Sequence, residues 1–129
     1  MKWTKTDILH WHRRALPACK VDSQRLKVSI ELAEMYGAYD YASKLEETAD
    51  VYIASVALWM RFHDNIGKFI FERIEKAKKW EEIAKAVDIK MDINNEEREF
   101  VLVGKEWRHK ELAAADCALK NATAEMLDP

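Results

Sequence analysis

The sequence predicts an all-α protein, an antiparallel helical bundle that forms a single domain over residues 1–129. Its composition is one reason: 49 % of the residues are apolar and 34 % are charged, with only three glycines and two prolines, as in helix-rich domains. The second reason is a pair of segments that would be apolar around most of a helix, joined by a short connection. The chain length also fits one domain.

The first half of the chain contains three predicted helices. Residues 4–16 form the first, capped by Thr6 or Asp7 and ended by Pro17. The second covers residues 23–39 and the third residues 43–62. The third starts at a predicted capping box, Ser43-Lys44-Leu45-Glu46. Because their connection is short, we expect the second and third helices to form an antiparallel hairpin over 23–62.

The second half is predicted from weaker periodicity. His63-Asp64-Asn65-Ile66-Gly67 interrupts the helical pattern and indicates a loop. A fourth helix is predicted over 66–87, followed by a connector over 88–95, for which a short strand is the alternative. Residues 95–127 are predicted to form a C-terminal helical extension that helps to assemble subunits.

Two acidic pairs lie within the predicted hairpin. Glu31 and Glu34 are three residues apart, as are Glu47 and Asp50, so each pair shares one helical face. Both helices are otherwise apolar over most of their circumference, which indicates burial. In an antiparallel hairpin, Glu31 lies level with Asp50 and Glu34 with Glu47, so all four carboxylates meet at one height.

Such a buried cluster requires a compensating charge. Unpaired buried carboxylates cost several kcal/mol each unless a cation or hydrogen bonds offset them. Acidic oxygen ligands facing one cavity suit Mg²⁺ or Mn²⁺. Lys27 and Arg61 share the helical faces of the acids, so we expect them to contact a phosphate or to pair with the acids.

The motif Glu-x-x-Glu, a short gap and Glu-x-x-Asp, with the segment EETADVYIASV at residues 46–56, resembles the MazG-like all-α nucleoside triphosphate pyrophosphohydrolases. The resemblance covers roughly residues 24–79. It implies that Glu31, Glu34, Glu47 and Asp50 bind Mg²⁺ (or Mn²⁺) as catalytic residues. It also implies hydrolysis of a nucleoside or deoxynucleoside triphosphate to the monophosphate and pyrophosphate, with Lys76 and Lys79 roughly where the family contacts phosphates.

Two alternatives remain open from the sequence. His12, His63-Asp64 and Asp116 have the chain order of the ligands in an HD-type phosphohydrolase. The other is a non-catalytic helical interaction module, in which the interior acids form salt bridges with Lys27 and Arg61. Metal binding distinguishes this module from both enzymes, because a salt-bridged core does not respond to Mg²⁺.

Charge and hydropathy narrow the partners. The net charge of −2 gives no electrostatic footprint for a nucleic acid polymer, whereas a nucleotide substrate requires none. Residues 51–60 are the longest uncharged stretch, too short for a membrane span of about 20 residues.

Two cysteines, Cys19 and Cys117, favour a reducing compartment, and we expect a cytoplasmic protein. Apolar faces of roughly 200°, wider than one core requires, predict a homodimer or homotetramer.

Overall fold

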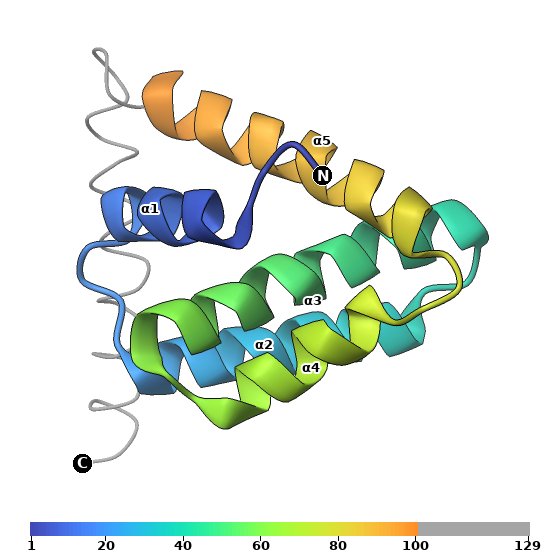
Figure 1. Ribbon diagram of the computed structural model, residues 1–129, viewed down its shortest axis with the longest axis horizontal. Helices are drawn as coiled ribbons and strands as arrows, with labels where there is room; N and C mark the ends of the chain where they lie inside the picture. The colour runs from blue at the N-terminus through green and yellow to red at the C-terminus, as the bar shows by residue number, and fades with distance from the viewer. Residues whose placement is uncertain (101–129) are drawn as a thin grey trace.

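The computed structural model describes residues 1–100, and the side chains of residues 1–96. This part of the chain contains helices and no strand (Figure 1). The helices are α1 (Lys5–Ala15), α2 (Val21–Gly37), α3 (Tyr41–Phe62), α4 (Asn65–Glu75) and α5 (Trp80–Phe100). The predicted all-α class is therefore confirmed for the described residues. The extension predicted beyond residue 100, with Asp116 and Cys117, lies outside them.

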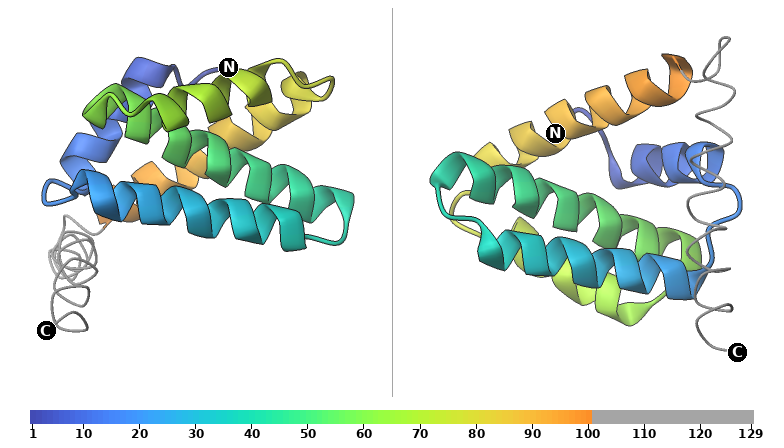
Figure 2. Two further views of the ribbon diagram at one scale, coloured as in Figure 1. Left: turned by 90° about the horizontal axis from the view of Figure 1, so that it is seen from below. Right: turned by 180° about the vertical axis from the view of Figure 1, so that it is seen from behind.

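Helix α3 is the centre of the fold. The helices α1, α2, α4 and α5 all pack against it, and the right-hand view of Figure 2 shows α1 and α5 on one side and α2 and α4 on the other. Eight consecutive residues, from Val51 to Leu58, are buried. A helix that is apolar nearly all round is stable only when neighbours enclose it, and the four surrounding helices do so here.

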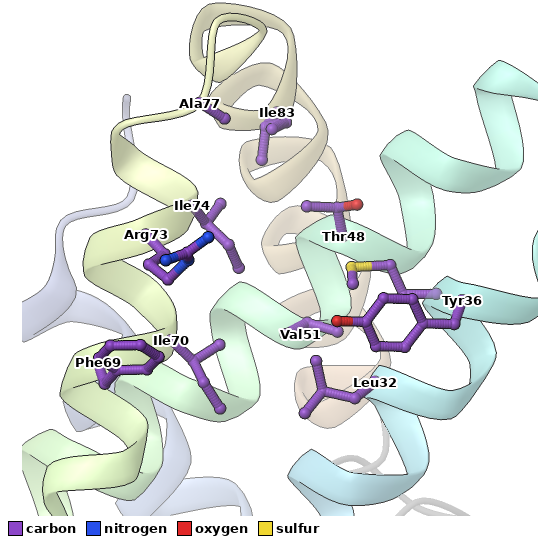
Figure 3. A pocket seen from close by; sticks show the side chains of 11 residues that line it. Leu32, Tyr36, Thr48, Val51, Phe69, Ile70, Arg73, Ile74, Ala77 and Ile83 are labelled. Atoms are coloured by element: carbon purple, nitrogen blue, oxygen red, sulfur yellow. The ribbon is translucent and has the colours of Figure 1, made fainter.

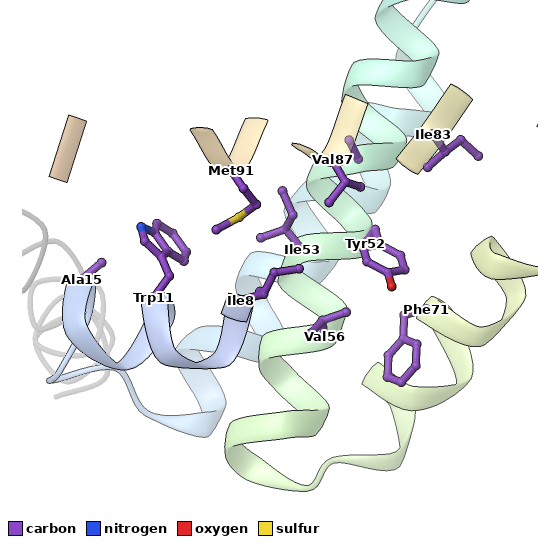
Figure 4. Close-up of a cluster of buried hydrophobic side chains, with 11 residues drawn as sticks. Ile8, Trp11, Ala15, Tyr52, Ile53, Val56, Phe71, Ile83, Val87 and Met91 are labelled. Atoms are coloured by element: carbon purple, nitrogen blue, oxygen red, sulfur yellow. The ribbon is translucent and has the colours of Figure 1, made fainter. Parts of the chain in front are cut away.

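The main core cluster joins α1, α3, α4 and α5. Tyr52, Ile53 and Val56 of α3 lie at its centre, and Figure 4 shows side chains of the other three helices around them. These surrounding residues are Ile8 and Trp11 of α1, Phe71 of α4, and Ile83, Val87 and Met91 of α5. The contact between α3 and α4 depends on Gly67, because a Cβ there would lie 2.5 Å from the carbonyl oxygen of Ser55.

The starts of two helices differ from the prediction. Thr4, rather than Thr6 or Asp7, caps α1, and Asp7 completes a capping box by accepting the backbone N–H of Thr4. Asp40 caps α3, where its side chain accepts the backbone N–H of Ser43 at 2.7 Å. The capping box predicted at Ser43 is therefore wrong. Asp is among the strongest N-cap residues, and at Asp40 it begins the helix one turn earlier.

The predictions for the second half of the chain require correction. The interruption after α3 is limited to His63 and Asp64, because Asp64 caps α4 by accepting the backbone N–H of Ile66 at 3.0 Å. The predicted fourth helix is divided: α4 ends at Glu75, and α5 begins at Trp80. The residues between them, 76–79, are all exposed, so no packing holds a single helix straight across this lysine-rich segment.

Helix α5 then continues through residues 88–95, which were predicted to be a connector or a short strand. Its buried residues Ile83, Val87 and Met91 are spaced four apart, so they share the face that packs on α3. None of the helices within residues 1–100 is long and apolar enough to cross a membrane.

Candidate metal centre

Helices α2 and α3 bring three of the predicted acidic residues together. Residues 38–40 connect the two helices, which run antiparallel (Figure 1). Carboxylate oxygens of Glu31, Glu34 and Glu47 all lie within 4.8 Å of one another. Glu31 is only 5 % exposed, Glu47 is half-buried and Glu34 is exposed. One side of the cluster is thus enclosed while the other is open to solvent.

Two oxygens of this cluster are buried without a hydrogen-bond partner within the described part of the chain. They are the Oε2 atoms of Glu31 and Glu47. The other oxygen of Glu31, Oε1, lies 2.6 Å from Nζ of Lys27. Since nearly all buried polar atoms in proteins are hydrogen-bonded, and buried charges require a partner, these two oxygens leave an unmet electrostatic demand. A cation placed between them would meet it.

Asp50 borders this cluster. Burial raises the pKa of Asp50 to about 6; the charges of Glu31 and Glu47 act in the same direction, and Lys90 opposes them. Oδ2 of Asp50 lies 3.4 Å from Nζ of Lys90. The carboxyl group therefore gains or loses its proton at a pH close to neutral, unlike an ordinary aspartate.

Lys90 is the residue at this site that the sequence analysis missed. Its Nζ lies 2.8 Å from Oε1 of Glu46 as well as 3.4 Å from Asp50. Burial acts to lower the pKa of Lys90, but the two carboxylates outweigh it and the pKa is raised. Residues 88–95 were interpreted as a connector, so no helix was expected to bring a cation here. The four-residue spacing of Val87 and Met91 was the signal that continued the helix.

The predicted substrate-binding cations are dispersed. Lys27 lies at the cluster, paired with Glu31. Arg61 does not pair with the acids: it donates to the carbonyl oxygens of Leu16 at 2.7 Å and Pro17 at 3.0 Å. Arg61 is eleven residues beyond Asp50, about 16 Å along the helix axis, so the expected pairing is wrong.

Lys76 and Lys79 lie in the exposed segment between α4 and α5. Nζ of Lys79 is 3.6 Å from Oε2 of Glu82 and 6.0 Å from the centroid of the Tyr41 ring. Neither lysine forms an ion pair with Glu31, Glu34, Glu47 or Asp50 in the described structure. Their contact with a phosphate stays a prediction from the resemblance.

The residues of the alternative HD-type site have other roles. His12 is buried, with Nε2 2.9 Å from Oε1 of Gln24. His63 ends α3, and Asp64 forms an ion pair with Arg25. Within the part of the chain whose side chains are described, the one group of three or more His, Cys, Asp or Glu residues suited to a metal ion is Glu31, Glu34 and Glu47.

The three carboxylates, with Asp50 beside them, form a hard, oxygen-only donor set. Such a set suits Mg²⁺ or Mn²⁺ better than softer metals that prefer thiolate or imidazole. Comparison of this chain with protein-family models, with curated proteins and with solved structures finds no match.

Proposed function

We propose that this protein is a metal-dependent nucleotide pyrophosphohydrolase, which converts a nucleoside or deoxynucleoside triphosphate to the monophosphate and pyrophosphate. One observation carries the metal site: the buried and unpartnered Oε2 atoms of Glu31 and Glu47, beside the carboxylate of Glu34. The reaction itself rests on the resemblance of the acidic motifs to the MazG-like family.

The donor set fits the metal that the proposal requires. Glu31, Glu34 and Glu47 would hold Mg²⁺ or Mn²⁺, with Asp50 as a further ligand. When bound, the ion would neutralise phosphate charge and lower the pKa of a bound water. It would also replace the missing partners of the two buried oxygens.

Asp50 is suited to hold a proton during hydrolysis. Catalytic bases are most effective when their pKa lies near the working pH, and the pKa of Asp50 is about 6. This value is that of the metal-free protein, in which the carboxylate is mostly ionised at neutral pH; a cation held by Glu31 and Glu47 would lower it. We assign it the role of general base when it is not acting as a metal ligand.

Lys90 and Lys27 are the cations best placed to contact the phosphates. Lys90 already lies beside Asp50, and Lys27 beside Glu31. A triphosphate is more highly charged than either carboxylate, so both ammonium groups can exchange a carboxylate partner for a phosphate oxygen. This assignment replaces Arg61, whose guanidinium is bound to backbone carbonyls.

Product analysis tests the reaction. The protein is incubated with a panel of nucleoside and deoxynucleoside triphosphates and either Mg²⁺ or Mn²⁺, and the products are separated by chromatography. We expect the monophosphate and pyrophosphate in equal amounts. Orthophosphate as the sole product would reject this reaction, and metal binding without hydrolysis of any nucleotide would reject the enzyme.

The ion pairs at the site support one alternative, a non-catalytic helical module. Lys27 with Glu31, and Lys90 with Glu46 and Asp50, neutralise part of the acidic charge. They leave Oε2 of Glu31 and of Glu47 without a partner among the described residues. The alternative predicts that neither Mg²⁺ nor Mn²⁺ changes the thermal stability of the protein.

We also propose that the protein forms a homodimer or homotetramer. An exposed small-and-apolar stripe on α2, formed by Leu26, Ile30, Ala33 and Gly37, motivates this. Its spacing of four, three and four residues is that of helices that pack side by side. A Cβ added at Gly37 would have no described atom within 4 Å. Sedimentation at micromolar concentration should show an assembly larger than the monomer, and Ile30→Glu should dissociate it.

A cytoplasmic location fits an enzyme that acts on free nucleotides, and a mononucleotide rather than a nucleic acid polymer fits the small net charge.

A further inference from the structure

A cavity lies between α2, α3, α4 and the start of α5 (Figure 3). Its volume is about 360 Å³, within the range of roughly 300–1,000 Å³ that small-molecule sites occupy. Most of its wall is aliphatic, formed by Leu32, Val51, Ile70, Ile74, Ala77 and Ile83. The cavity can therefore enclose a small apolar body.

Two aromatic side chains flank this cavity. Tyr36 of α2 is 80 % exposed and Phe69 of α4 is 63 % exposed, and both line the cavity. Figure 3 shows their rings on opposite sides of it. Exposed aromatic rings gathered at a concave surface are typical of binding sites rather than of ordinary surface.

Arg73 gives the cavity its charge. It is the one charged residue among those that line the cavity, and it is exposed. Its guanidinium lies 5.8 Å from the centroid of the Phe69 ring, and it forms no ion pair within the described residues. An unpaired guanidinium beside an apolar cavity favours an anionic group on whatever enters.

This cavity is separate from the metal centre. Leu32 follows Glu31 and Thr48 follows Glu47 in the chain, and adjacent residues point about 100° apart on a helix. The cavity thus opens on a different face of the hairpin from the carboxylates. Helix α4 borders the cavity, whereas Lys90 of α5 borders the acids.

We propose that the cavity binds a small molecule with an apolar body and one anionic group. A flat aromatic or aliphatic body lies between Tyr36, Phe69 and the aliphatic wall, and its carboxylate or sulfonate group pairs with Arg73. The binding requires neither a metal ion nor a nucleotide, so it stands or falls independently of the proposed hydrolysis.

Two fluorescent probes of nearly the same shape test this proposal. 8-Anilinonaphthalene-1-sulfonate carries a sulfonate group, whereas N-phenyl-1-naphthylamine has the same rings without it. We expect both to bind the intact protein saturably, one per chain. Arg73→Gln should lower the affinity for the sulfonate probe about fivefold, the effect of one exposed ion pair. The affinity for the neutral probe should be nearly unchanged. Lys68→Gln, an exposed cation of α4 outside the cavity lining, is the matched control.

A blocking variant keeps the test independent of folding. Ala77 is exposed and lines the cavity, so Ala77→Trp fills the space without disturbing the core. It should abolish binding of both probes while circular dichroism and the melting temperature stay the same. Binding that persists in Ala77→Trp, equal weakening of both probes by Arg73→Gln, or no saturable binding would overturn the proposal. Sedimentation gives a further way to overturn it. If the only effect of Ala77→Trp is a smaller assembly, a second copy of the chain occupies the cavity instead of a small molecule.

Discussion

The two ends of α3 carry polar clusters that differ in how completely their groups are paired. At the C-terminal end, Arg61 donates to Leu16, Pro17 and Nδ1 of His12. Since an arginine only donates, Nδ1 of His12 accepts, and its Nε2 carries the proton shared with Gln24 at 2.9 Å. Gln24 in turn donates to the carbonyl oxygen of Ala54 at 3.0 Å. We call this network closed because each of its side chains has a hydrogen-bond partner within the protein.

At the N-terminal end, the carboxylates of Glu31 and Glu47 each leave one buried oxygen without a partner in the described structure. Both ends are polar and partly enclosed, so burial alone does not separate a structural network from a site. The difference lies in pairing: every group of the closed network has a partner, whereas the open one has two oxygens that a bound cation would satisfy. We therefore expect substitutions at the two ends to have opposite effects on stability and activity.

The largest expected effect is at the open end. Glu31→Gln or Glu47→Gln removes a charged ligand and should reduce nucleotide hydrolysis by about 100-fold or more, the scale of losing a catalytic carboxylate. Without metal, both variants should be as stable as the original protein or more stable, because a repelling buried charge is removed. Steady-state kinetics and thermal melts without metal measure the two effects.

The matched control for these variants is Glu72→Gln, which changes an exposed acid on α4. It should alter neither activity nor stability. Equal losses in Glu31→Gln and Glu72→Gln would remove the distinction between the cluster and any surface acid.

The closed end should respond in the opposite way. Arg61→Ala removes the hydrogen bonds that the guanidinium donates to the carbonyl oxygens of Leu16 and Pro17 and to Nδ1 of His12, and should cost about 2 kcal/mol of unfolding free energy. Activity per folded molecule should be nearly unchanged, because Arg61 lies away from the acids. Urea denaturation with assays at low temperature separates the two quantities. A stable but inactive Arg61→Ala protein would contradict the structural role.

Lys90 tests the border of the open cluster. Lys90→Gln removes the cation beside Glu46 and Asp50, and should raise KM for a triphosphate about tenfold, the loss of one charged contact with phosphate. Lys85→Gln, an exposed lysine on the same helix, is the control and should leave KM unchanged. An unchanged KM in Lys90→Gln would restrict Lys90 to a structural ion pair.

The smallest expected effect is the pH dependence that Asp50 causes. Its pKa is raised from an ordinary value of 3.8 to about 6, so the folded metal-free protein binds a proton more tightly than the unfolded chain. Linkage then requires this group to stabilise the fold as pH falls from 7 to 5, by about 1 kcal/mol. Asp50→Asn lacks this contribution, because an amide side chain does not bind a proton in this pH range.

Urea denaturation of both proteins at several pH values measures this contribution. The original protein should gain stability relative to Asp50→Asn as pH falls through 6. A difference between the two proteins that does not change between pH 7 and 5 would show that Asp50 is not perturbed.

The hairpin was predictable because its signals are local and periodic. Each helix carries apolar residues around most of its own circumference, and a short connection fixes the direction of the next helix. That Glu34 and Glu47 lie at the same height in the hairpin therefore follows from counting residues. Asp40 was missed as the start of α3 because several residues near residue 40 are able to cap a helix. The side chain of Asp40 decides the start by accepting the backbone N–H of Ser43.

The rest depended on information that periodicity does not contain. Arg61 shares a helical face with Asp50, but its phase around the helix says nothing about their separation of about 16 Å along it. Lys90 is brought to the acids only because the chain bends at residues 76–79 and α5 then packs back on α3. That bend has no distinct sequence signal, since a lysine-rich segment also occurs on exposed helix surfaces.

Calorimetric titration of the protein with Mn²⁺, without nucleotide, tests the open cluster most directly. We predict saturable binding to the original protein and to Glu72→Gln, and binding at least about tenfold weaker in Glu31→Gln and Glu47→Gln. No saturable binding to the original protein, or equal binding by Glu31→Gln, would show that the unpartnered oxygens of Glu31 and Glu47 do not hold a metal ion.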